Sequence, residues 1–215
     1  MYLAPKTPDI PTRRYGVQGT VALQTSTEMD ARQRLYVGRI QEASQLLLQL
    51  ISDILDMGKI EAGQLSLELT TFSPRELVQN CLRSYAGMAQ RKGLLLFSCV
   101  DLDIPALVEG DAVRIRQILS NLVSNAIKFT DVGRVAVQVH AHQVEAGRVQ
   151  MRFEVYDTGI GIEKEQLGHL FQPFFMVEGR AHTGQGAGLG LSICERLAKL
   201  MGASIQVRSE YQNGS

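Results

Sequence analysis

The sequence has no excess of charge of either sign, few cysteines and no long apolar run, and each shortage excludes a class of protein. Its 22 Lys and Arg balance 22 Asp and Glu, so no overall field attracts nucleic acid or anionic lipid. Cys81, Cys99 and Cys194 have neither Cys-x-x-Cys nor metal-ligand spacing, which favours reduced thiols. No apolar run approaches about 18 residues, and the N-terminus has no signal-peptide core. We expect a cytoplasmic chain with no membrane segment, although its parent protein can still be membrane-anchored.

The first sixty residues divide into an irregular stretch and a helical segment. Pro5, Pro8 and Pro11 disfavour a regular helix before about Tyr15. A short helix is predicted over residues 16–25, with a connection over residues 25–30. We therefore assign residues 1–14 to an irregular region and residues 15–60 to a helical segment.

A long helix is predicted over residues 31–56, with Gly58 near the position of a C-terminal capping glycine. Apolar residues recur along it at helical spacing and form a wide stripe. These residues are Leu35, Val37, Ile40, Leu46, Leu47, Leu50, Ile51, Ile54 and Leu55. A homodimer, such as a four-helix bundle from two hairpins, buries such a stripe. The alternative is that the stripe packs on the C-terminal domain of the same chain.

Residues 64–215 alternate between strand and helix patterns and predict one α+β domain. Ser73, Pro74 and Glu76 form a capping box that opens a helix toward Gln90. Asp111 is expected to cap a second long helix, which ends at about Phe129. Strands are expected at 64–72, 94–100, 107–110, 134–142, 148–156 and 203–208, and two further helices at 163–171 and 189–201. The predicted architecture is a sheet with helices on one face.

Three polar residues of the second long helix share one face. Asn121, Asn125 and Lys128 stand at positions i, i+4 and i+7 of that helix. An amide oxygen is a hard donor that suits Mg²⁺, and a lysine ammonium suits phosphate. Polar residues on a helix face are usually only solvated, so this pattern alone does not identify a site.

Three further features follow in order along the chain. Asp157, Gly159 and Gly161 come directly after a strand, where a carboxylate can accept a hydrogen bond from an amine such as adenine N6. The aromatic segment 171–175 is interpreted mainly as core packing. The Gly-rich segment 184–191 runs into a helix, whose first N–H groups form an anion site. This segment is neither a Walker loop nor a dinucleotide fingerprint.

Taken together, these four features resemble the N, G1, F and G2 boxes of sensor histidine kinases. The resemblance extends from about Arg32 onward, and its most specific segments are QILSNLVSNAIKFT and GAGLGLSICERLAKLMG. It implies the Bergerat (GHKL) α/β sandwich that gyrase, Hsp90 and MutL share. The segment ISDILDMGKIEAG is similar to the second dimerization helix of hybrid sensor kinases, which implies a helical-hairpin dimerization segment before the catalytic domain.

The resemblance implies ATP and Mg²⁺ as ligands and assigns roles by position. Asn125 would ligate Mg²⁺ with support from Asn121, Lys128 would contact phosphate, and Asp157 would bind the adenine amine. Catalysis is assigned to Asn121 and Lys128. The remaining ATP-binding positions would line the adenine side, form the hinge of an ATP lid over residues 176–186, or contact phosphate. They are Gly159, Gly161, Thr183, Gly186, Gly188, Leu189 and Gly190. Ala187 replaces a common hydroxyl residue, for which Thr183 would substitute.

Two positions depart from the patterns of related families. Gyrase-like ATPases have a glutamate base where this chain has Asn121, and an amide cannot take a proton from water. The resemblance therefore favours transfer of the ATP γ-phosphate to a protein group over hydrolysis. In the motif that carries the acceptor histidine, this chain has Pro8, while Asp9, Ile10 and Thr12 fit. We therefore expect that the chain has lost its own phosphoacceptor.

The leading hypothesis is the ATP-binding and dimerization core of a two-component histidine protein kinase, with a response regulator or receiver domain as partner. One alternative is a catalytically silent nucleotide-binding partner that regulates another kinase, and a less favoured one is a gyrase-like ATPase. His140, His142, His169 and His182 are expected to be ordinary solvated or hydrogen-bonding residues. The family usually has one more strand after the final residues, SEYQNGS, so an exposed sheet edge and reduced stability are also expected.

Overall fold

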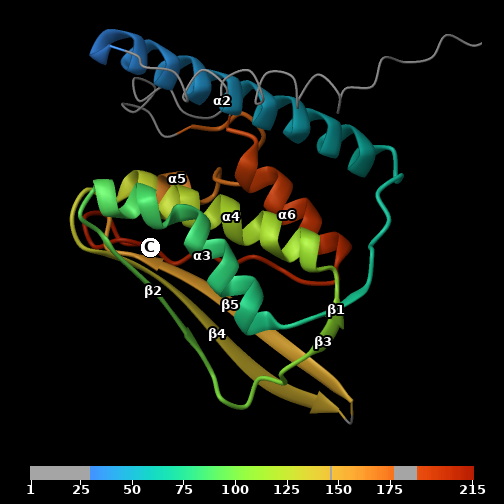
Figure 1. The fold of residues 1–215 in the computed structure, drawn as a ribbon. Helices are drawn as coiled ribbons and strands as arrows, with labels where there is room; N and C mark the ends of the chain where they lie inside the picture. The colour runs from blue at the N-terminus through green and yellow to red at the C-terminus, as the bar shows by residue number, and fades with distance from the viewer. Residues whose placement is uncertain (1–29, 146, 177–187) are drawn as a thin grey trace, which may run out of the picture. The chain divides into compact units, whose positions relative to one another are not determined.

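The computed structural model describes residues 30–145, 147–176 and 188–215 (Figure 1). The predicted short helix at 16–25 and the Pro8 motif lie outside these residues. The chain divides into two compact units, residues 1–58 and 59–215, which are described separately below. Among the described residues, none of the helices combines the length and the apolar character needed to cross a bilayer.

The helix of the first unit, α2 (Ala31–Glu61), continues past the predicted end at residue 56. Gly58 lies inside the helix, and Gly63, with φ +63°, takes the capping position instead. The Gly63 amide donates to Ile60 O at 3.1 Å and the Gln64 amide to Lys59 O at 2.9 Å, the bond pair of a Schellman cap. Many large apolar side chains of α2 are exposed in the single chain, and a dimer through this helix stays a prediction. They are Leu35, Tyr36, Ile40, Leu47, Ile51, Ile54 and Leu55.

The second unit consists of helices on one face of a sheet, which confirms the predicted mixed architecture (Figure 1). Its elements are β1 (Thr70–Phe72), α3 (Pro74–Arg91), β2 (Leu95–Val100), β3 (Val108–Gly110), α4 (Ala112–Phe129), β4 (Arg134–Glu145), β5 (Arg148–Asp157), α5 (Lys164–Leu167) and α6 (Gly190–Leu200). Strands β1 and β3 form an antiparallel pair. The main sheet has the order β2-β4-β5, with β2 parallel and β5 antiparallel to β4.

Both predicted caps start their helices as expected. Ser73 Oγ accepts from the Glu76 amide at 3.3 Å, with Pro74 in the first turn of α3. Asp111 Oδ1 accepts from the Arg114 amide at 3.0 Å, and its Oδ2 accepts from the Glu68 amide at 3.1 Å. The buried Asp111 carboxylate therefore starts α4 and also fastens the chain before β1.

The core lies between the sheet and helices α3 and α4. Alternate residues of β4 point inward and are almost fully buried, as the period of a strand requires. The helices contribute residues at helical spacing to the same cluster. The main contributors are Val135, Val137 and Val139 from β4, Val78 and Leu82 from α3, and Leu119, Val123 and Ile127 from α4. This packing fixes α4, the helix that carries the predicted site, against the sheet.

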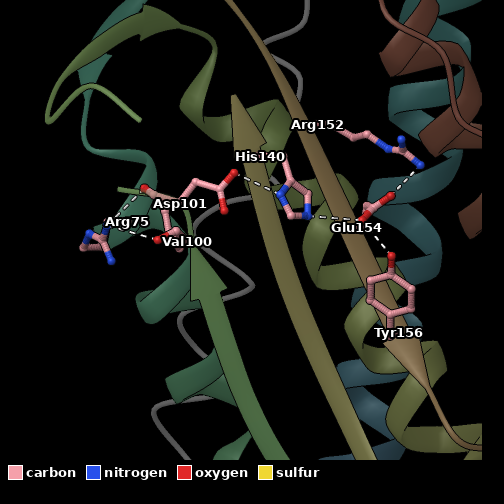
Figure 2. A network of polar contacts seen from close by, with 7 residues as sticks. All are labelled: Arg75, Val100, Asp101, His140, Arg152, Glu154 and Tyr156. Atoms are coloured by element: carbon pink, nitrogen blue, oxygen red, sulfur yellow. Dashed lines mark hydrogen bonds and ion pairs between the residues drawn. The ribbon is translucent and has the colours of Figure 1, made fainter. Parts of the chain in front are cut away.

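A polar network crosses the strands of the main sheet (Figure 2). His140 Nδ1 lies 3.0 Å from Asp101 Oδ2, and its Nε2 lies 3.4 Å from Glu154 Oε2. Glu154 also accepts from Tyr156 Oη at 2.7 Å and pairs with Arg152. His140 is therefore a hydrogen-bonding residue of the sheet, as predicted.

One strand prediction was wrong in extent and another was wrong altogether. Of residues 64–72, only β1 at the end of this range is a strand, because its ladder partner β3 has only three residues. Residues 203–208 are not a strand, although the side chains of 204–208 alternate between exposed and half-buried. Alternation needs only an extended backbone, whereas a strand also needs a hydrogen-bonded partner. No ladder involving these residues is found in the described chain.

We predict that Leu119→Ala lowers the free energy of unfolding by about 2–5 kcal/mol, because it opens a cavity under α4. Urea denaturation of the full chain, followed by circular dichroism, measures the loss. Leu102→Ala makes the same chemical change at a side chain that is 94% exposed and should cost under about 0.5 kcal/mol. Equal losses in the two variants would contradict the assigned core.

Candidate functional site

The two asparagines of α4 contact each other directly. Asn125 Nδ2 donates to Asn121 Oδ1 at 3.0 Å, and both side chains are half-buried. The spacing of four residues brings them together on one helix face, as the sequence predicted. The bond uses the amide nitrogen of Asn125, so its amide oxygen takes no part in this contact.

The start of α6 lies against Asn121. A methyl group added at Gly190 would overlap the Asn121 amide, whose Oδ1 would lie 2.8 Å away. Only a residue without a side chain lets α6 approach α4 this closely. Gly190 and Asn121, which lie far apart in the sequence, thus form one contact.

The Lys128 side chain lies near the end of α4 in a partly buried position. Burial lowers the pKa of its ammonium below the usual value of 10.5. Its Nζ lies 4.9 Å from the centre of the Phe129 ring, within the range of a cation–π contact. The ammonium is therefore held over the last residue of α4.

Asp157 is the last residue of β5, at the strand end that the sequence predicted. Its Oδ1 accepts from the Gly159 amide at 2.8 Å. Burial raises the pKa of this carboxyl above the usual value of 3.8, and hydrogen bonds from Gly159 and Ser215 partly offset that effect. A carboxylate can accept about four hydrogen bonds, so these partners leave acceptor capacity for a ligand.

Gly159 joins this carboxylate to the end of α4. A Cβ at Gly159 would overlap Phe129 O and lie 2.9 Å from Thr130 Oγ1. The next amide, from Ile160, donates to Phe129 O at 3.3 Å. The turn after β5 therefore lies against the last carbonyl of α4, and a side chain at Gly159 would separate the two.

Two other predicted glycines also lie close to a backbone. Gly161, with φ +64°, contacts the Glu210 carbonyl, and Gly188, with φ +71°, lies against Phe174. The Phe174 amide donates to Gly188 O at 3.0 Å. The Phe174 side chain is 68% exposed, so the interpretation of the aromatic segment as core packing was wrong for this residue. The backbone of Phe174 makes the contact, and only a glycine at position 188 can approach it this closely.

The N-terminal end of α6 has no side-chain cap among the described residues. Leu189 precedes the helix with its side chain buried, so only its backbone can reach a ligand at this end. Thr183 and Gly186 lie outside the described residues, as do Ala187 and most of the predicted lid.

The groups that complete the C-terminal end of α4 were not predicted from the sequence. Lys92 Nζ donates to Ile127 O at 3.0 Å, to Lys128 O at 2.9 Å and to Thr130 O at 3.0 Å. Thr130 Oγ1 donates to Ala126 O at 2.7 Å. The only sequence signal for Lys92 was a lysine at the end of the preceding helix, which gives no indication of its partners.

A cavity of about 250 Å³ borders the turn after β5 and is lined by Asp131, Val132, Thr158, Gly159, Ile160 and Gln212. A hollow of about 620 Å³ lies between α3 and β2, and none of the predicted site residues lines it. The smaller cavity therefore borders the predicted site at Gly159, and none of the other predicted site residues lines it.

Residues 110–215 match the family described as histidine kinase-, DNA gyrase B-, and HSP90-like ATPase. The chain is 40% identical over 216 residues to the sensor histidine kinase RcsC of Escherichia coli, which covers 100% of this chain and 22% of the relative. It is 39% identical over 215 residues to the sensor histidine kinase GacS of Pseudomonas protegens, over 100% of this chain and 23% of the relative. The chain thus spans less than a quarter of the length of these relatives.

Solved structures show the same fold. A crystal structure of full-length ShkA in complex with AMPPNP matches with a TM-score of 0.73 and 33% identity, over 94% of this chain and 41% of that one. The Acinetobacter baumannii histidine kinase AdeS matches with a TM-score of 0.64 and 20% identity, over 95% and 91% of the two chains. The second unit therefore has the α/β sandwich of histidine kinase catalytic domains.

We predict that Gly190→Ala lowers the free energy of unfolding by about 1–3 kcal/mol, because the new methyl group displaces the Asn121 amide. Thermal melts of the full chain measure the loss, and Asn121→Ala in the same chain should restore part of it. Gly168→Ala is the matched control, since nothing lies within 4 Å of its added Cβ. Unchanged stability in Gly190→Ala would contradict the described contact between α4 and α6.

Proposed function

We propose that this chain is the ATP-binding catalytic core of a two-component sensor histidine kinase. Through residues 110–215 it belongs to the histidine kinase-, DNA gyrase B-, and HSP90-like ATPase family. The observation that carries the proposal is the junction at α4. There Asn121 contacts the start of α6, and the end of the helix contacts the turn that follows Asp157. Three of the four predicted motifs therefore meet on one helix.

The adenine end of the site is proposed at Asp157. Its carboxylate stands at the end of β5, is held by the Gly159 amide and keeps acceptor capacity for an exocyclic amine. The cavity beside Gly159 provides apolar contact from Val132 and Ile160. A half-buried acceptor close to two apolar side chains suits a flat base with an amino group, such as adenine.

The phosphate end is proposed at Asn125, Lys128 and the start of α6. The bond to Asn121 orients the Asn125 amide oxygen, a hard donor that suits Mg²⁺, so these residues fit the metal. A bound Mg²⁺ would neutralise phosphate charge. Lys128 supplies a positive charge, and the amides of α6 that lack a side-chain cap suit anionic oxygens. The predicted contacts from Thr183 and Gly186 complete this end of the proposal.

Transfer to a protein group is proposed over hydrolysis. Asn121 stands where gyrase-like ATPases have their glutamate base, and its amide is engaged with Asn125. An amide does not accept a proton from water, so this site has no base at that position. In the proposed reaction the γ-phosphoryl bond to ADP breaks, a bond to a histidine ring nitrogen forms, and the imidazole releases its proton.

The acceptor histidine is proposed to lie on another chain. Pro8 stands where the resemblance requires the histidine, and proline has no nucleophilic ring nitrogen in a chain. Many apolar side chains of residues 31–56 are exposed in the single chain. Pairing through them with a related chain that has the histidine would bring that acceptor to this site, whereas a second copy of this chain also has Pro8. We propose a cytoplasmic location and a response regulator or receiver domain as the next acceptor. A catalytically silent regulatory partner is the second candidate, and Pro8 is the observation that favours it.

We predict that Asp157→Asn weakens ADP binding by about 1–3 kcal/mol, because a carboxylate acceptor for the base amine is lost. The same variant should be at least as stable as the wild type at neutral pH. The pKa of Asp157 is higher in the folded state than in the unfolded state, so its protonation stabilises the fold. This stabilisation is complete below the unfolded pKa near 3.8 and is lost as pH rises through the folded pKa. Calorimetry and melts over a pH series measure both effects.

The contrast between the two readouts makes this test specific. A variant that binds ADP as well as the wild type would contradict the adenine assignment. A variant that loses both affinity and stability would show that Asp157 acts through folding instead. Asp103→Asn is a suitable control, since it makes the same chemical change at an exposed aspartate in the loop after β2.

A labelling experiment tests the reaction itself. The full chain is incubated with γ-labelled Mg·ATP, alone and with a related dimerization domain that has an intact histidine. Label on the added domain alone is the predicted result. Label on neither protein, despite measured ATP binding, would favour the silent partner, and acid-labile label on residues 1–25 would contradict the lost acceptor.

A further inference from the structure

Lys92 contacts the end of a helix that it does not belong to. It is the C-cap residue of α3, and its ammonium donates to the carbonyls of Ile127, Lys128 and Thr130 at 2.9–3.0 Å. A fourth, longer contact joins it to Asp131 Oδ1 at 3.5 Å. The ammonium therefore links the ends of α3 and α4.

The geometry suits a lysine. An ammonium has three hydrogens, and three carbonyl oxygens converge on it at hydrogen-bond distance. The last carbonyls of a helix carry its partial negative charge, so a cation is favourable there. The Lys92 side chain is 33% exposed and Asp131 is 87% exposed, so water screens the Asp131 contact more than the three carbonyl contacts.

The carbonyls that Lys92 holds belong to the residues that border the proposed nucleotide site. One of them is the carbonyl of Lys128, the proposed phosphate contact. Another is that of Thr130, whose hydroxyl oxygen would lie 2.9 Å from a Cβ on Gly159. Between them, Phe129 O receives the Ile160 amide. The position of residues 128–130 therefore determines where both the base end and the phosphate end of the proposed site lie.

We propose that Lys92 is a positioning residue of the nucleotide site, which holds the last turn of α4 in the orientation that ADP and ATP require. Lys92 acts through the α4 backbone and touches no ligand itself. The proposal rests on the proposed function and extends it to a residue outside the four motifs. It also makes the end of α3 part of the support of the site.

The test compares nucleotide affinity with stability in the full chain. Lys92→Met keeps the length of the side chain and removes its donors, and it should weaken Mg·ADP binding by about tenfold at a temperature where the protein is folded. Lys92→Arg keeps the charge, but a planar guanidinium cannot direct three donors to the three carbonyls, so it should show a smaller loss of affinity. Calorimetry gives the affinity, and thermal melts give the stability.

Two control variants separate positioning from folding. Val78→Ala removes core volume from α3 and should lower the melting temperature with unchanged Mg·ADP affinity. Arg91→Met removes the neighbouring positive charge and should also leave the affinity unchanged. If Val78→Ala weakened binding as much as Lys92→Met at matched stability, a purely structural role would explain the data and the proposal would be overturned.

The outcomes distinguish this inference from the function it extends. If the wild-type chain does not bind Mg·ADP, the proposed function fails and the inference fails with it. If the wild type binds and the Lys92 variants that fold bind equally well, only the positioning role is overturned. Weaker binding in Lys92→Met and Lys92→Arg, with both controls at wild-type affinity, supports it.

Discussion

The C-terminal end of α4 is the point on which the site depends. A helix leaves its last four carbonyls without partners inside the helix, and a buried end needs donors from elsewhere. Here the Ala126 carbonyl receives the Thr130 hydroxyl, the next two receive the Lys92 ammonium, and the Phe129 carbonyl receives the Ile160 amide. Three separate parts of the chain therefore meet at one helix end. The turn that carries Gly159 is held in place because it supplies one of these donors.

Close backbone approach is the second constraint on the site. Gly159 lies against the end of α4, and Gly190 lies against Asn121 near its middle. Gly188 adds a third contact, to the backbone of Phe174. At each of these positions a Cβ would meet another atom within 3 Å, so the elements around α4 approach as closely as they do only because these residues lack side chains. The glycines act on packing first, and ligand binding would use the surfaces that this packing creates.

Local patterns predicted much of this arrangement. The spacing of Asn121 and Asn125 predicted their shared face, Ser73 and Asp111 predicted two helix starts, and the position after a strand predicted the place of Asp157. These features depend on residues only a few positions apart. The alternation of element types likewise predicted a sheet with helices on one face.

The features that sequence analysis missed depend on distant partners. Lys92 binds carbonyls about 35 residues away, and nothing near it in the sequence indicates that contact. The segment 203–208 has the alternation of a strand but no ladder partner among the described residues. Phe174 was interpreted as core because aromatic residues are usually buried, yet its backbone makes the contact with Gly188 and its ring is exposed. Each case was decided by tertiary structure.

The turn after β5 and the end of α4 are proposed to form a site for an adenine nucleotide. A comparison of Mg·ADP with Mg·IDP, whose base carries an oxo group in place of the 6-amino group, tests this proposal. Calorimetry on the full chain gives the two affinities under one set of conditions. We predict that ADP binds at least about tenfold more tightly, because Asp157 accepts a hydrogen bond from the 6-amino group, which the 6-oxo group of IDP cannot donate. Equal affinity for the two nucleotides would contradict it.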